Sequence, residues 1–449
     1  MRVVLGLGRT GIAATRFLLR QKEKVLAMDD YLEEEHIPQD IKEDERFEFC
    51  SPADFLMKAD FPSISEVITS PGIPLTHPVL RASKERKIPV ISEIELATRF
   101  ISFPLIGVTG SCGKSTTVFW TKQILERAGW SVFLGGNWGC PLIESLSAPE
   151  KFDWGVVELS SFQLAHIDKA RFSVAVVLNL FPNHLDYHST TENYFWAKAR
   201  ILENQKRTDF AVINFSSSCW SARFSRLVKS QLIPVARDKK LSEGFYIWDN
   251  KVFRGKEPLF SLSHFSLPGK HQQENLLVAL SIALLAGVEK KVTEEAIASL
   301  SSLPHRLEKV GSWGGIDYFN DSKSTTPSST RVAVESLSCP VILILGGKAK
   351  VDDFSELTTT FQSGKVKAVV VYGESRNLIE KFIPPHLERH LVFSLEEAVK
   401  KAKSLAGEGD AVLLSPACTS WDQYRSFEER GEHFRQLVYE LERSGISRY

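Results

Sequence analysis

The sequence contains a glycine-rich loop of a type that binds phosphate groups, with the pattern T-G-x-x-G-K-S-T at residues 109–116. A short apolar run, Leu105–Thr109, comes before the loop, and a stretch with helical periodicity, Thr116–Ala128, follows it. Backbone N–H groups at such a junction can surround phosphate oxygens, Lys114 can neutralise the β- and γ-phosphate charge, and a hydroxyl can hold Mg²⁺. Because Val108 stands where the strict pattern has its first glycine, a fortuitous glycine-rich turn is the alternative. We predict an ATP-type phosphate site formed by residues Gly110, Ser111, Cys112, Gly113, Lys114, Ser115 and Thr116.

A second glycine loop lies near the N-terminus, where Gly6–Gly11 has the pattern G-x-G-x-x-G. It follows the apolar run Val3–Leu5, and Asp29 ends the next apolar run, 18 residues after Gly11. Glycines at such positions let backbone amides approach a diphosphate at a helix N-terminus. The pattern predicts a Rossmann-like site for a nucleotide or diphosphate, and a tight turn without a ligand is the alternative. Asp29 is either an acceptor for a ribose hydroxyl or a solvated acid at a strand end.

The presence of both loops narrows the class of reaction. An NAD-dependent oxidoreductase needs only the first loop, and a simple ATPase needs only the second. An enzyme that joins a nucleotide-linked substrate to another molecule, driven by ATP, uses both.

The elements that must position these loops are short apolar runs followed by turns and helical stretches. Most runs are continuous rather than alternating, which is typical of strands covered on both faces in the parallel sheets of α/β domains. The helix at Thr116–Ala128 places Trp120, Ile124 and Ala128 on one face and ends at Gly129. The predicted strands are Val3–Leu5, Lys24–Met28, Val67–Thr69, Leu105–Thr109, Trp154–Leu159, Val174–Leu178, Ala211–Asn214, Val341–Leu345, Ala368–Tyr372 and Ala411–Leu414.

Two breaks divide the chain. Pro104 comes just before a new strand, and the segment Leu303–Arg306 follows a helix-like stretch at Thr293–Ser301. We therefore predict three domains, at residues 1–102, 103–302 and 303–449, which agrees with about 150 residues per domain.

Composition excludes several classes of protein. The 449 residues carry 55 Lys and Arg against 55 Asp and Glu, so no overall positive field favours nucleic acid. No apolar run approaches the roughly 18 residues of a membrane span, and because the first residues lack the apolar region and cleavage site of a signal peptide, we expect none. Six scattered cysteines without a CxxC pair indicate reduced thiols. We expect a cytoplasmic monomer that acts on small molecules, without a nucleic-acid partner or a membrane span.

Further motifs run through the chain in a fixed order: residues 158–164 (E-L-S-S-F-Q-L), Asn179 to Asp186, Lys198, His305-Arg306, residues 320–325 (N-D-S-K-S-T) and residues 414–418 (L-S-P-A-C). With these motifs the whole chain resembles the ATP-dependent muramyl ligases of peptidoglycan synthesis. The E-L-S-S-F-Q-L string and the S-P-A-C…F-E-x-R-G pattern resemble the D-glutamate-adding members. The resemblance implies an α/β fold with a Rossmann-like UDP-binding domain, a central P-loop ATPase-like domain around a parallel sheet, and a Rossmann-like C-terminal domain that binds the amino acid.

The resemblance also implies a reaction. A carboxylate is a poor electrophile, so the family moves the γ-phosphoryl group of ATP onto the carboxylate of UDP-N-acetylmuramoyl-L-alanine. The amine of D-glutamate then displaces phosphate from this acyl phosphate. Phosphoryl transfer between anions depends on positioning and charge neutralisation, so we expect Mg²⁺, Lys and Arg at the site rather than a Ser-His-Asp triad.

The expected metal ligands come partly from the residues and partly from the resemblance. Glu158 ends a strand beside the phosphate loop, where a carboxylate can ligate Mg²⁺, and an ordinary strand-end acid is the alternative. An ammonium group offers only donors, so Lys198 by itself is expected to be a solvated helix residue. The resemblance implies two Mg²⁺ ions and an N6-carboxylated Lys198. The implied metal ligands are Ser115, Glu158, His184 and the carboxylated Lys198, and the implied catalytic residues are Lys114, Glu158, His184, Lys198 and Lys323.

The remaining site residues are implied by matching motifs. For ATP these are the phosphate loop together with Asn275, Arg306 and Asp321, the last two from a C-terminal domain that closes over the nucleotide. For the UDP-sugar they are Gly8, Arg9, Thr10, Ser70, Asn137 and Ser161. For D-glutamate they are Lys323, Thr325, Lys350, Ser420 and Phe427, with Lys348 as a rival of Lys350.

Four other interpretations stay open at this point. Sibling muramyl ligases would add a different amino acid, and a folylpolyglutamate synthase-like ligase would lack the first glycine loop. An NAD-dependent oxidoreductase leaves the second loop, Glu158 and Lys198 without a role. A regulatory or binding module descended from a ligase would not need the lysines at 114, 198 and 323.

Overall fold

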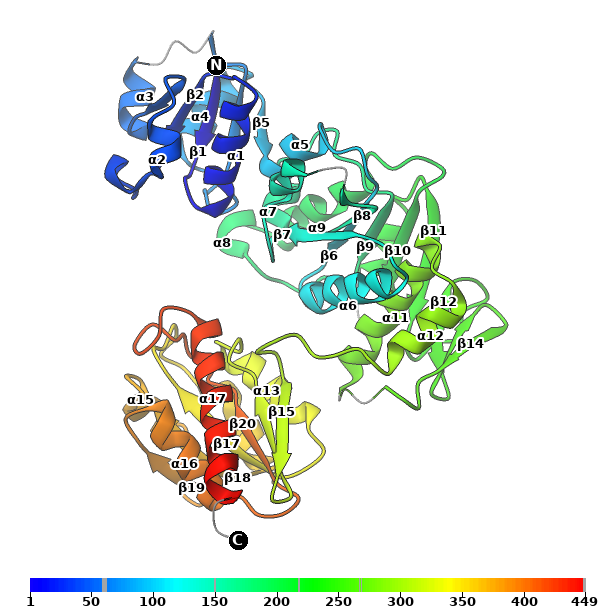
Figure 1. The fold of residues 1–449 in the computed structure, drawn as a ribbon, viewed down its shortest axis with the longest axis vertical. Helices are drawn as coiled ribbons and strands as arrows, with labels where there is room; N and C mark the ends of the chain where they lie inside the picture. Colours follow the sequence, from blue (N-terminus) through cyan, green and yellow to red (C-terminus); the bar gives the residue numbers. More distant parts are fainter. Residues whose placement is uncertain (59–62, 149–150, 217–218, 266, 268, 447–449) are drawn as a thin grey trace. The chain divides into compact units, whose positions relative to one another are not determined.

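The computed structural model describes residues 1–58, 63–148, 151–216, 219–265, 267 and 269–446. The chain forms two compact units. Unit 1 consists of Met1–Ser266 and Gln273–Leu300, and unit 2 consists of Leu267–Gln272 and Ser301–Tyr449. Within the described residues, unit 1 contains two β-sheets and unit 2 contains one (Figure 1).

The first sheet of unit 1 is parallel, with the strand order β3-β2-β1-β4-β5, which matches the first five strands of the Rossmann order 3-2-1-4-5-6. Its buried valine, leucine and isoleucine side chains face helices on both sides. Helices α1 (Arg9–Arg20), α2 (Gln39–Lys42) and α5 (Glu93–Thr98) cover one face, and α3 (Pro52–Lys58) and α4 (Pro78–Glu85) cover the other. The strands are β1 (Arg2–Leu5), β2 (Val25–Met28), β3 (Phe47–Phe49), β4 (Glu66–Thr69) and β5 (Val90–Ser92).

The second sheet of unit 1 has the order β14-β13-β12-β11-β10-β9-β6-β8-β7. It is parallel from β7 to β12 and ends in two antiparallel strands. The strands are β6 (Leu105–Thr109), β7 (Val132–Gly136), β8 (Trp154–Glu158), β9 (Val174–Val177), β10 (Phe210–Asn214), β11 (Gln231–Ala236), β12 (Phe245–Trp248), β13 (Lys251–Arg254) and β14 (Glu257–Ser261).

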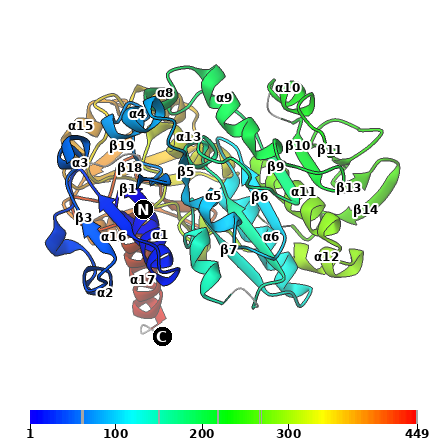
Figure 2. The same cartoon turned by 90° about the horizontal axis from the view of Figure 1, so that it is seen from above.

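Helix α6 (Lys114–Arg127) starts at the phosphate loop and packs across β6, β7 and β8 (Figure 2). Its Trp120 and Ile124 are fully buried, as the sequence pattern predicts, and Gly129 follows the helix with φ +87°. The other helical segments of this part are η3 (Leu142–Ser147), α7 (Ser161–Leu164), α8 (Leu185–His188), α9 (Thr191–Ala199), η5 (Arg200–Leu202), α10 (Ser221–Ser225), α11 (Lys270–Ala286) and α12 (Lys290–Ile297).

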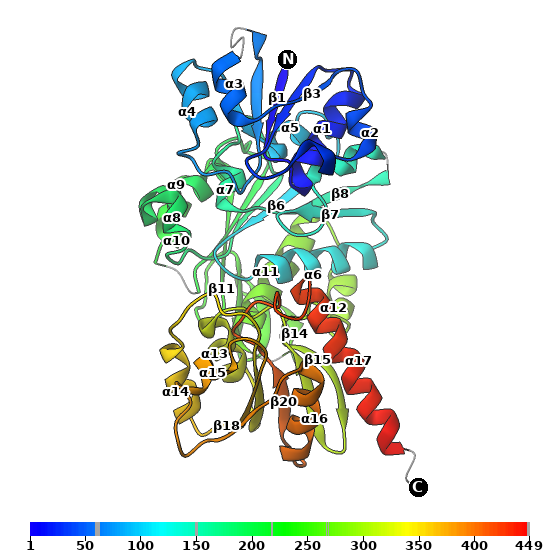
Figure 3. The same cartoon turned by 90° about the vertical axis from the view of Figure 1, so that its left-hand side faces the viewer.

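The sheet of unit 2 has the order β15-β16-β20-β17-β18-β19, and only the edge strand β15 is antiparallel to its neighbour. Helices α13 (Pro327–Ser336), α14 (Thr358–Gln362) and α15 (Arg376–Glu380) cover one face. Helices α16 (Leu395–Leu405) and α17 (Phe427–Ile446) cover the other (Figure 3). The strands are β15 (Glu308–Trp313), β16 (Ile316–Asn320), β17 (Val341–Gly346), β18 (Val366–Tyr372), β19 (Glu388–Leu391) and β20 (Ala411–Leu414).

All ten strands predicted from continuous apolar runs are present, with ends that differ by at most two residues. The predicted α/β fold with parallel sheets is therefore confirmed. No helix in the described part of the chain is both long and apolar enough to cross a membrane. All six cysteines fall within the described residues, and each is a free thiol. The domain boundaries near residues 102 and 302 stay predictions.

Candidate active site

The phosphate loop lies at the carboxyl end of β6. The nearby strands β9, β8 and β7 of the same sheet also have polar residues at or just after their carboxyl ends. Gly113 precedes α6 with φ +85°, and a Cβ atom there would collide with the side-chain oxygen of Asn275 in α11. Glycine is therefore needed both for the left-handed backbone and for the close approach of α11. The structure thus brings Asn275, predicted from its motif, next to the loop from more than 150 residues away.

Two lysines converge on this loop. The Nζ atom of Lys114, the first residue of α6, donates to the carbonyl oxygens of Gly110 at 2.9 Å and Ser111 at 3.1 Å. The Nζ atom of Lys198 in α9 also donates to Gly110 O, at 3.0 Å, and to Thr109 Oγ1 at 3.3 Å. Lys114 brings a positive charge to this loop and the amino group of Lys198 lies beside it, an arrangement suited to phosphate.

Lys198 is buried, with 1% of its surface exposed, and its ammonium lies 4.7 Å from the ring centre of Tyr194. Burial and the neighbouring charge of Lys114 hold the pKa of Lys198 well below its usual value. The expectation that Lys198 is a solvated helix lysine is therefore wrong. The helical run alone could not reveal this, because the tertiary contact of α9 with the phosphate loop causes the burial.

Glu158 is the last residue of β8, next to β6, and is 3% exposed. Its Oε1 atom accepts a hydrogen bond of 2.7 Å from the side chain of Asn137, which follows the neighbouring strand β7. Its Oε2 atom is buried without a hydrogen-bond partner among the described residues. A buried carboxylate oxygen that lacks a donor is costly unless a cation satisfies it, so Glu158 fits a Mg²⁺ ligand.

His184 lies before α8 and adopts a left-handed conformation with φ +55°. Its exposed ring packs edge-on against Phe162 at a centroid distance of 4.8 Å. Partial burial and the charges of Lys198 and Lys114 lower the pKa of His184, which favours the neutral imidazole that can bind a metal ion. Ser115, the other implied ligand, is buried in the first turn of α6.

Sequence reasoning missed the role of Asn179, although its motif was noted. Its Oδ1 atom accepts hydrogen bonds from the backbone N–H groups of Ser111 at 3.0 Å and Cys112 at 2.9 Å, and its Nδ2 atom donates to Cys112 O at 3.1 Å. Asn179 thus shapes the phosphate loop from the end of the adjacent strand β9. The available signal was a polar side chain directly after a buried strand, since ligand sites lie at the carboxyl ends of parallel strands.

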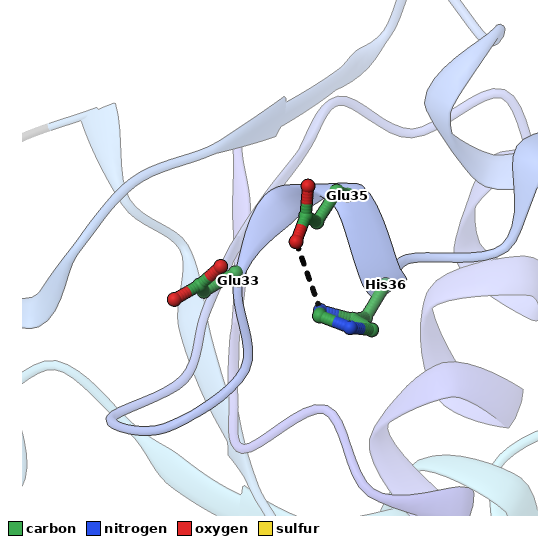
Figure 4. A group of neighbouring side chains, drawn as sticks. All are labelled: Glu33, Glu35 and His36. Carbon is green, nitrogen blue, oxygen red and sulfur yellow. Dashed lines mark ion pairs between the residues drawn. The ribbon is translucent and has the colours of Figure 1, made fainter.

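One group of exposed side chains, Glu33, Glu35 and His36, also has the atom types and spacing of a metal site in the described residues. Figure 4 shows that they belong to one short turn, with an ion pair of 4.0 Å between Glu35 and His36. The group shares no residue with the phosphate loop, and exposed acidic side chains of this kind are common without a metal ion. It therefore adds nothing to the metal site expected from the sequence.

The first glycine loop is held by the residues that flank it. The Oδ2 atom of Asp29 accepts from the backbone N–H of Leu7 at 2.7 Å, and Oδ1 accepts from Tyr31 and Leu32. Burial raises the pKa of Asp29, but the three hydrogen bonds together lower it by more, so the net shift is downward. Asp29 is thus more than a solvated acid at a strand end, because it fastens the loop, and its contact with a ribose hydroxyl stays a prediction.

Two more features close this loop. The hydroxyl group of Ser70, at the end of β4, donates to Gly6 O at 2.7 Å. A Cβ atom at Gly11 would collide with Gly6 O, so the turn needs glycine there. Of the predicted UDP-sugar residues, Gly8 and Arg9 are exposed at the start of α1, and Thr10 is half-buried. They lie together at one helix N-terminus, where an anion is favoured.

Unit 2 brings its predicted residues to the carboxyl ends of three neighbouring strands, β16, β20 and β17. The ammonium of Lys323 lies 4.4 Å from the ring centre of Phe427, at the start of α17. That of Lys350 lies 5.9 Å from the ring centre of Trp421. Ser420 is buried and Thr325 is half-buried in the same loops.

Lys348 differs from its rival Lys350 in its surroundings. Its ammonium lies 3.9 Å from the carboxylate of Glu374, and its backbone pairs with that of Thr419. Among the described residues, Lys350 has no carboxylate partner. This difference favours Lys350 as the cation left for a bound anion.

The predicted nucleotide residues of unit 2 also lie together. Asp321 is buried and accepts hydrogen bonds from the backbone N–H of Leu307 at 3.0 Å and the hydroxyl of Ser415 at 2.8 Å. Its carboxylate therefore holds the turn that carries Arg306. Burial raises the pKa of Asp321 to about 6, although these hydrogen bonds oppose the shift.

A buried arginine connects the loops of unit 2, and sequence reasoning did not single it out. Arg430 in α17 is 0% exposed. Its guanidinium donates to Ser322 Oγ at 2.9 Å, to Ser322 O at 2.7 Å and to Cys418 O at 3.1 Å. It thereby ties the loop after β16 to the loop after β20. The signal was its place in the F-E-x-R-G pattern, which did not say whether the arginine points inward or outward.

Comparison with known proteins agrees with this arrangement. Residues 1–92 match the model of the Mur ligase MurD-like N-terminal domain, residues 108–283 that of the Mur ligase middle domain, and residues 305–418 that of the Mur ligase glutamate ligase domain. Curated relatives named UDP-N-acetylmuramoylalanine--D-glutamate ligase are similar over their full length. The protein from Thermoanaerobacter sp. (strain X514) is 35% identical over 450 residues, 98% of each chain, and that from Geobacter metallireducens is 37% identical over 442 residues, 98% of this chain and 97% of the relative.

Solved structures support the fold. The MurF ligase of Thermotoga maritima in complex with ADP matches with a TM-score of 0.59 at 18% identity and covers 93% of this chain and 96% of that one. The UDP-N-acetylmuramate-alanine ligase from the same organism matches with a TM-score of 0.56 at 16% identity and covers 98% and 99%. With three matching domain models and relatives that are similar from end to end, this chain belongs to the Mur ligase family.

Proposed function

We propose that this Mur ligase joins D-glutamate to UDP-N-acetylmuramoyl-L-alanine through an acyl phosphate, in the synthesis of the peptidoglycan precursor. The names of the relatives that are similar over their full length describe this activity. The observation that carries the proposed mechanism is the group at the carboxyl ends of β6 and β8. There, Lys114 and Lys198 share one carbonyl group of the phosphate loop, and one oxygen of the buried Glu158 has no donor in the part of the chain that the structure describes.

In the first step, the γ-phosphorus of ATP forms a bond to a carboxylate oxygen of the precursor while its bond to ADP breaks. The reacting groups are both anions, so the barrier depends on charge neutralisation and alignment. Lys114 binds the β and γ phosphates. Asn179 holds the loop that surrounds them, because it fixes the amides of Ser111 and Cys112.

When bound, Mg²⁺ would supply Lewis-acid charge that stabilises the phosphate oxygens. Glu158, His184 and Ser115 would hold the metal ions, together with a carboxylated Lys198. Asn137 orients Glu158 through its hydrogen bond to Oε1, which leaves Oε2 for the metal. This use of Asn137 is compatible with its predicted contact to the UDP-sugar.

Carboxylation converts Lys198 from a cation into an oxygen ligand. The Nζ lone pair forms a bond to the carbon of CO₂, and one proton leaves the nitrogen. The reaction needs a neutral amine, and the burial that lowers the pKa of Lys198 supplies it. Replacing Lys198 with alanine should abolish activity, and added acetate or formate should restore part of it. If the variant is as active as the wild type, Lys198 has no part in the reaction.

In the second step, the amine of D-glutamate attacks the acyl carbon, loses a proton and displaces phosphate. The amino acid carries two carboxylates, which Lys323 and Lys350 would bind. The hydroxyl groups of Thr325 and Ser420 would donate hydrogen bonds to it, and Phe427 packs beside Lys323. Arg306 would meet phosphate and Asp321 a ribose hydroxyl.

The UDP part of the precursor is assigned to the first glycine loop, at Gly8, Arg9 and Thr10, with Ser70 behind it. The sequence also predicts a sugar contact for Ser161, which is 2% exposed and has its hydroxyl oxygen 2.9 Å from Nε2 of His188. The domain assignment at 1–102, 103–302 and 303–449 belongs to this proposal, as do a monomeric state and a place in the cytoplasm.

Phosphate release in the presence of Mg-ATP and UDP-N-acetylmuramoyl-L-alanine tests the function. We expect release that requires D-glutamate and does not occur with L-glutamate, meso-diaminopimelate or L-lysine. Release with L-lysine would instead assign the chain to a sibling ligase. NADH oxidation without any phosphate release would exclude the ligase reaction.

A further inference from the structure

A buried histidine outside the predicted site lies between two elements of that site. His188 is the last residue of α8 and is 3% exposed. Its Nε2 atom is 2.9 Å from the hydroxyl oxygen of Ser161, which is 2% exposed at the start of α7. Helix α7 begins three residues after Glu158, and α8 begins directly after His184. The hydrogen bond therefore links the segments that carry two expected metal ligands.

The rings around His188 link it to His184. Phe162, next to Ser161, stacks on His188 at a centroid distance of 5.7 Å and contacts the edge of His184 at 4.8 Å. On another side, Tyr194 lies 5.4 Å from His188, and its hydroxyl is 3.1 Å from Ser111 Oγ in the phosphate loop. The backbone carbonyl of His188 also accepts from the side chain of Asn193 in α9.

We propose that His188 is a positioning residue, which fixes the turn of His184 relative to Glu158 through its hydrogen bond to Ser161. This inference rests on the proposed function, because it concerns the ligands of the metal ions. His184 is exposed and has a left-handed backbone, and its turn is only four residues long, so it needs support from outside. The pair of Ser161 and His188 forms the shorter of two side-chain hydrogen bonds here, and the other, of 3.4 Å, joins Tyr187 in α8 to His166, two residues after α7.

The proposal gives Ser161 a use that the motif did not suggest. Its hydroxyl oxygen is turned toward His188 inside the protein, so its effect on the reaction passes through the position of His184. Residues that orient a metal ligand typically change metal affinity by about 10–100-fold when they are replaced. A change of this size in metal affinity distinguishes a positioning role from a packing role, because the loss of packing alone changes the free energy of unfolding.

Two substitutions of His188 test the effect of its hydrogen bond separately from the effect of its ring. H188F keeps an aromatic ring between Phe162 and Tyr194 but loses the hydrogen bond. H188Q keeps an amide donor near the place of Nε2 but loses the ring. S161A removes the other partner, and S145A is the matched control, because Ser145 is a buried serine of the same unit whose hydroxyl has no hydrogen-bond partner among the described residues.

The measurement is Mn²⁺ binding by electron paramagnetic resonance, with the full chain, a β,γ-imido analogue of ATP and UDP-N-acetylmuramoyl-L-alanine, a complex that cannot turn over. We expect S161A and H188F to bind at least one Mn²⁺ about 10-fold more weakly or worse. H188Q and S145A should stay within about threefold of the wild type. The double variant S161A/H188F should be no weaker than either single variant, because both remove the same bond.

The result that overturns the proposal is wild-type Mn²⁺ affinity in folded S161A and H188F, with thermal unfolding as the check on folding. Weak binding by H188Q together with normal binding by H188F would also overturn it, because the ring and not the hydrogen bond would then matter. If these variants bind Mn²⁺ normally while the wild type forms product, only the positioning role fails. If the wild type binds no Mn²⁺ in this complex, the metal site of the proposed function fails with it.

Discussion

Several polar side chains at the strand ends hold the site together rather than facing open space. Asp29 and Ser70 fasten the first glycine loop, and Asn179 fastens the phosphate loop. Asn137 orients Glu158. Such supporting bonds matter because a phosphate site depends on preorganised donors, which lose little freedom when the ligand binds. The lysines can then act on phosphate groups from fixed positions.

At the residue scale, Lys114→Ala should lower kcat by about 10²–10³-fold or more, because it removes a positive charge from the transferring phosphoryl group. Thermal unfolding should change little. Lys122→Ala is the matched control, since Lys122 lies in the same helix and pairs with Glu126 at the surface. Steady-state phosphate release measures both variants, and equal activity of the two would refute the role of Lys114.

Motif residues could be predicted from the sequence, because their types and spacing indicate the chemistry that they can perform. Lys114, Glu158 and Asn275 all lie at the phosphate loop as expected. The partners of these residues could not be predicted. Asn179, His188 and Arg430 act through hydrogen bonds to segments far away in the sequence, and such contacts depend on the tertiary fold.

At the scale of elements, α5 joins the first sheet of unit 1 to the second. Glu95 is fully buried, and its Oε2 atom accepts from three successive backbone N–H groups, those of Asp168, Lys169 and Ala170, at 2.8–2.9 Å. Glu93, two residues before, accepts from the N–H of Ile143 at 2.5 Å, and its Oε2 atom is buried without a hydrogen-bond partner in the described residues. Two buried carboxyl groups thus attach this short helix to η3 and to the segment after α7.

Glu93 makes stability depend on pH. Burial raises its pKa from 4.5 to about 7, so between these values the folded protein holds a proton that the unfolded chain has released. The free energy of unfolding therefore falls as pH rises through this window, by about 3 kcal/mol in total. In E93Q this loss should be absent, so the wild type should lose stability relative to E93Q between pH 4.5 and pH 8. Urea unfolding at several pH values measures the difference.

The exposed Glu85 supplies the control, because E85Q changes a solvated carboxylate and should leave the pH dependence of the wild type unchanged. Parallel stability curves for the wild type and E93Q across the whole range would show that Glu93 titrates normally.

The continuous apolar strands could be predicted because burial on both faces requires apolar side chains at every position. Strands β3 and β5 are only three residues long and gave no such run. The hairpin of β12 and β13 is indicated by its turn residues and not by an apolar run. Asp249 and Asn250 both adopt positive φ there, which these residue types tolerate. Turn residues of this kind between two short runs are typical of tight hairpins.

Apart from Lys198 and Asn275, which lie within helices α9 and α11, and Arg306, which precedes β15, one rule at the scale of the whole molecule places the predicted residues. In each of the three sheets they follow the carboxyl ends of adjacent parallel strands: β2, β1 and β4 in the first, β9, β6, β8 and β7 in the second, and β16, β20 and β17 in the third. Ligands bind at such ends in open α/β sheets. Three sheets with three such ends suit a reaction of three substrates. In the proposed reaction ATP activates the carboxylate of the UDP-sugar precursor, and the amine of D-glutamate then attacks it.

The transfer of oxygen tests the acyl phosphate directly. UDP-N-acetylmuramoyl-L-alanine labelled with ¹⁸O in its carboxylate is incubated with Mg-ATP, D-glutamate and the enzyme, and the released phosphate is analysed by mass spectrometry. If the carboxylate accepts the γ-phosphoryl group and then loses it as phosphate, each phosphate carries one ¹⁸O from the precursor. Phosphate without ¹⁸O, formed together with the amide product, would contradict the account.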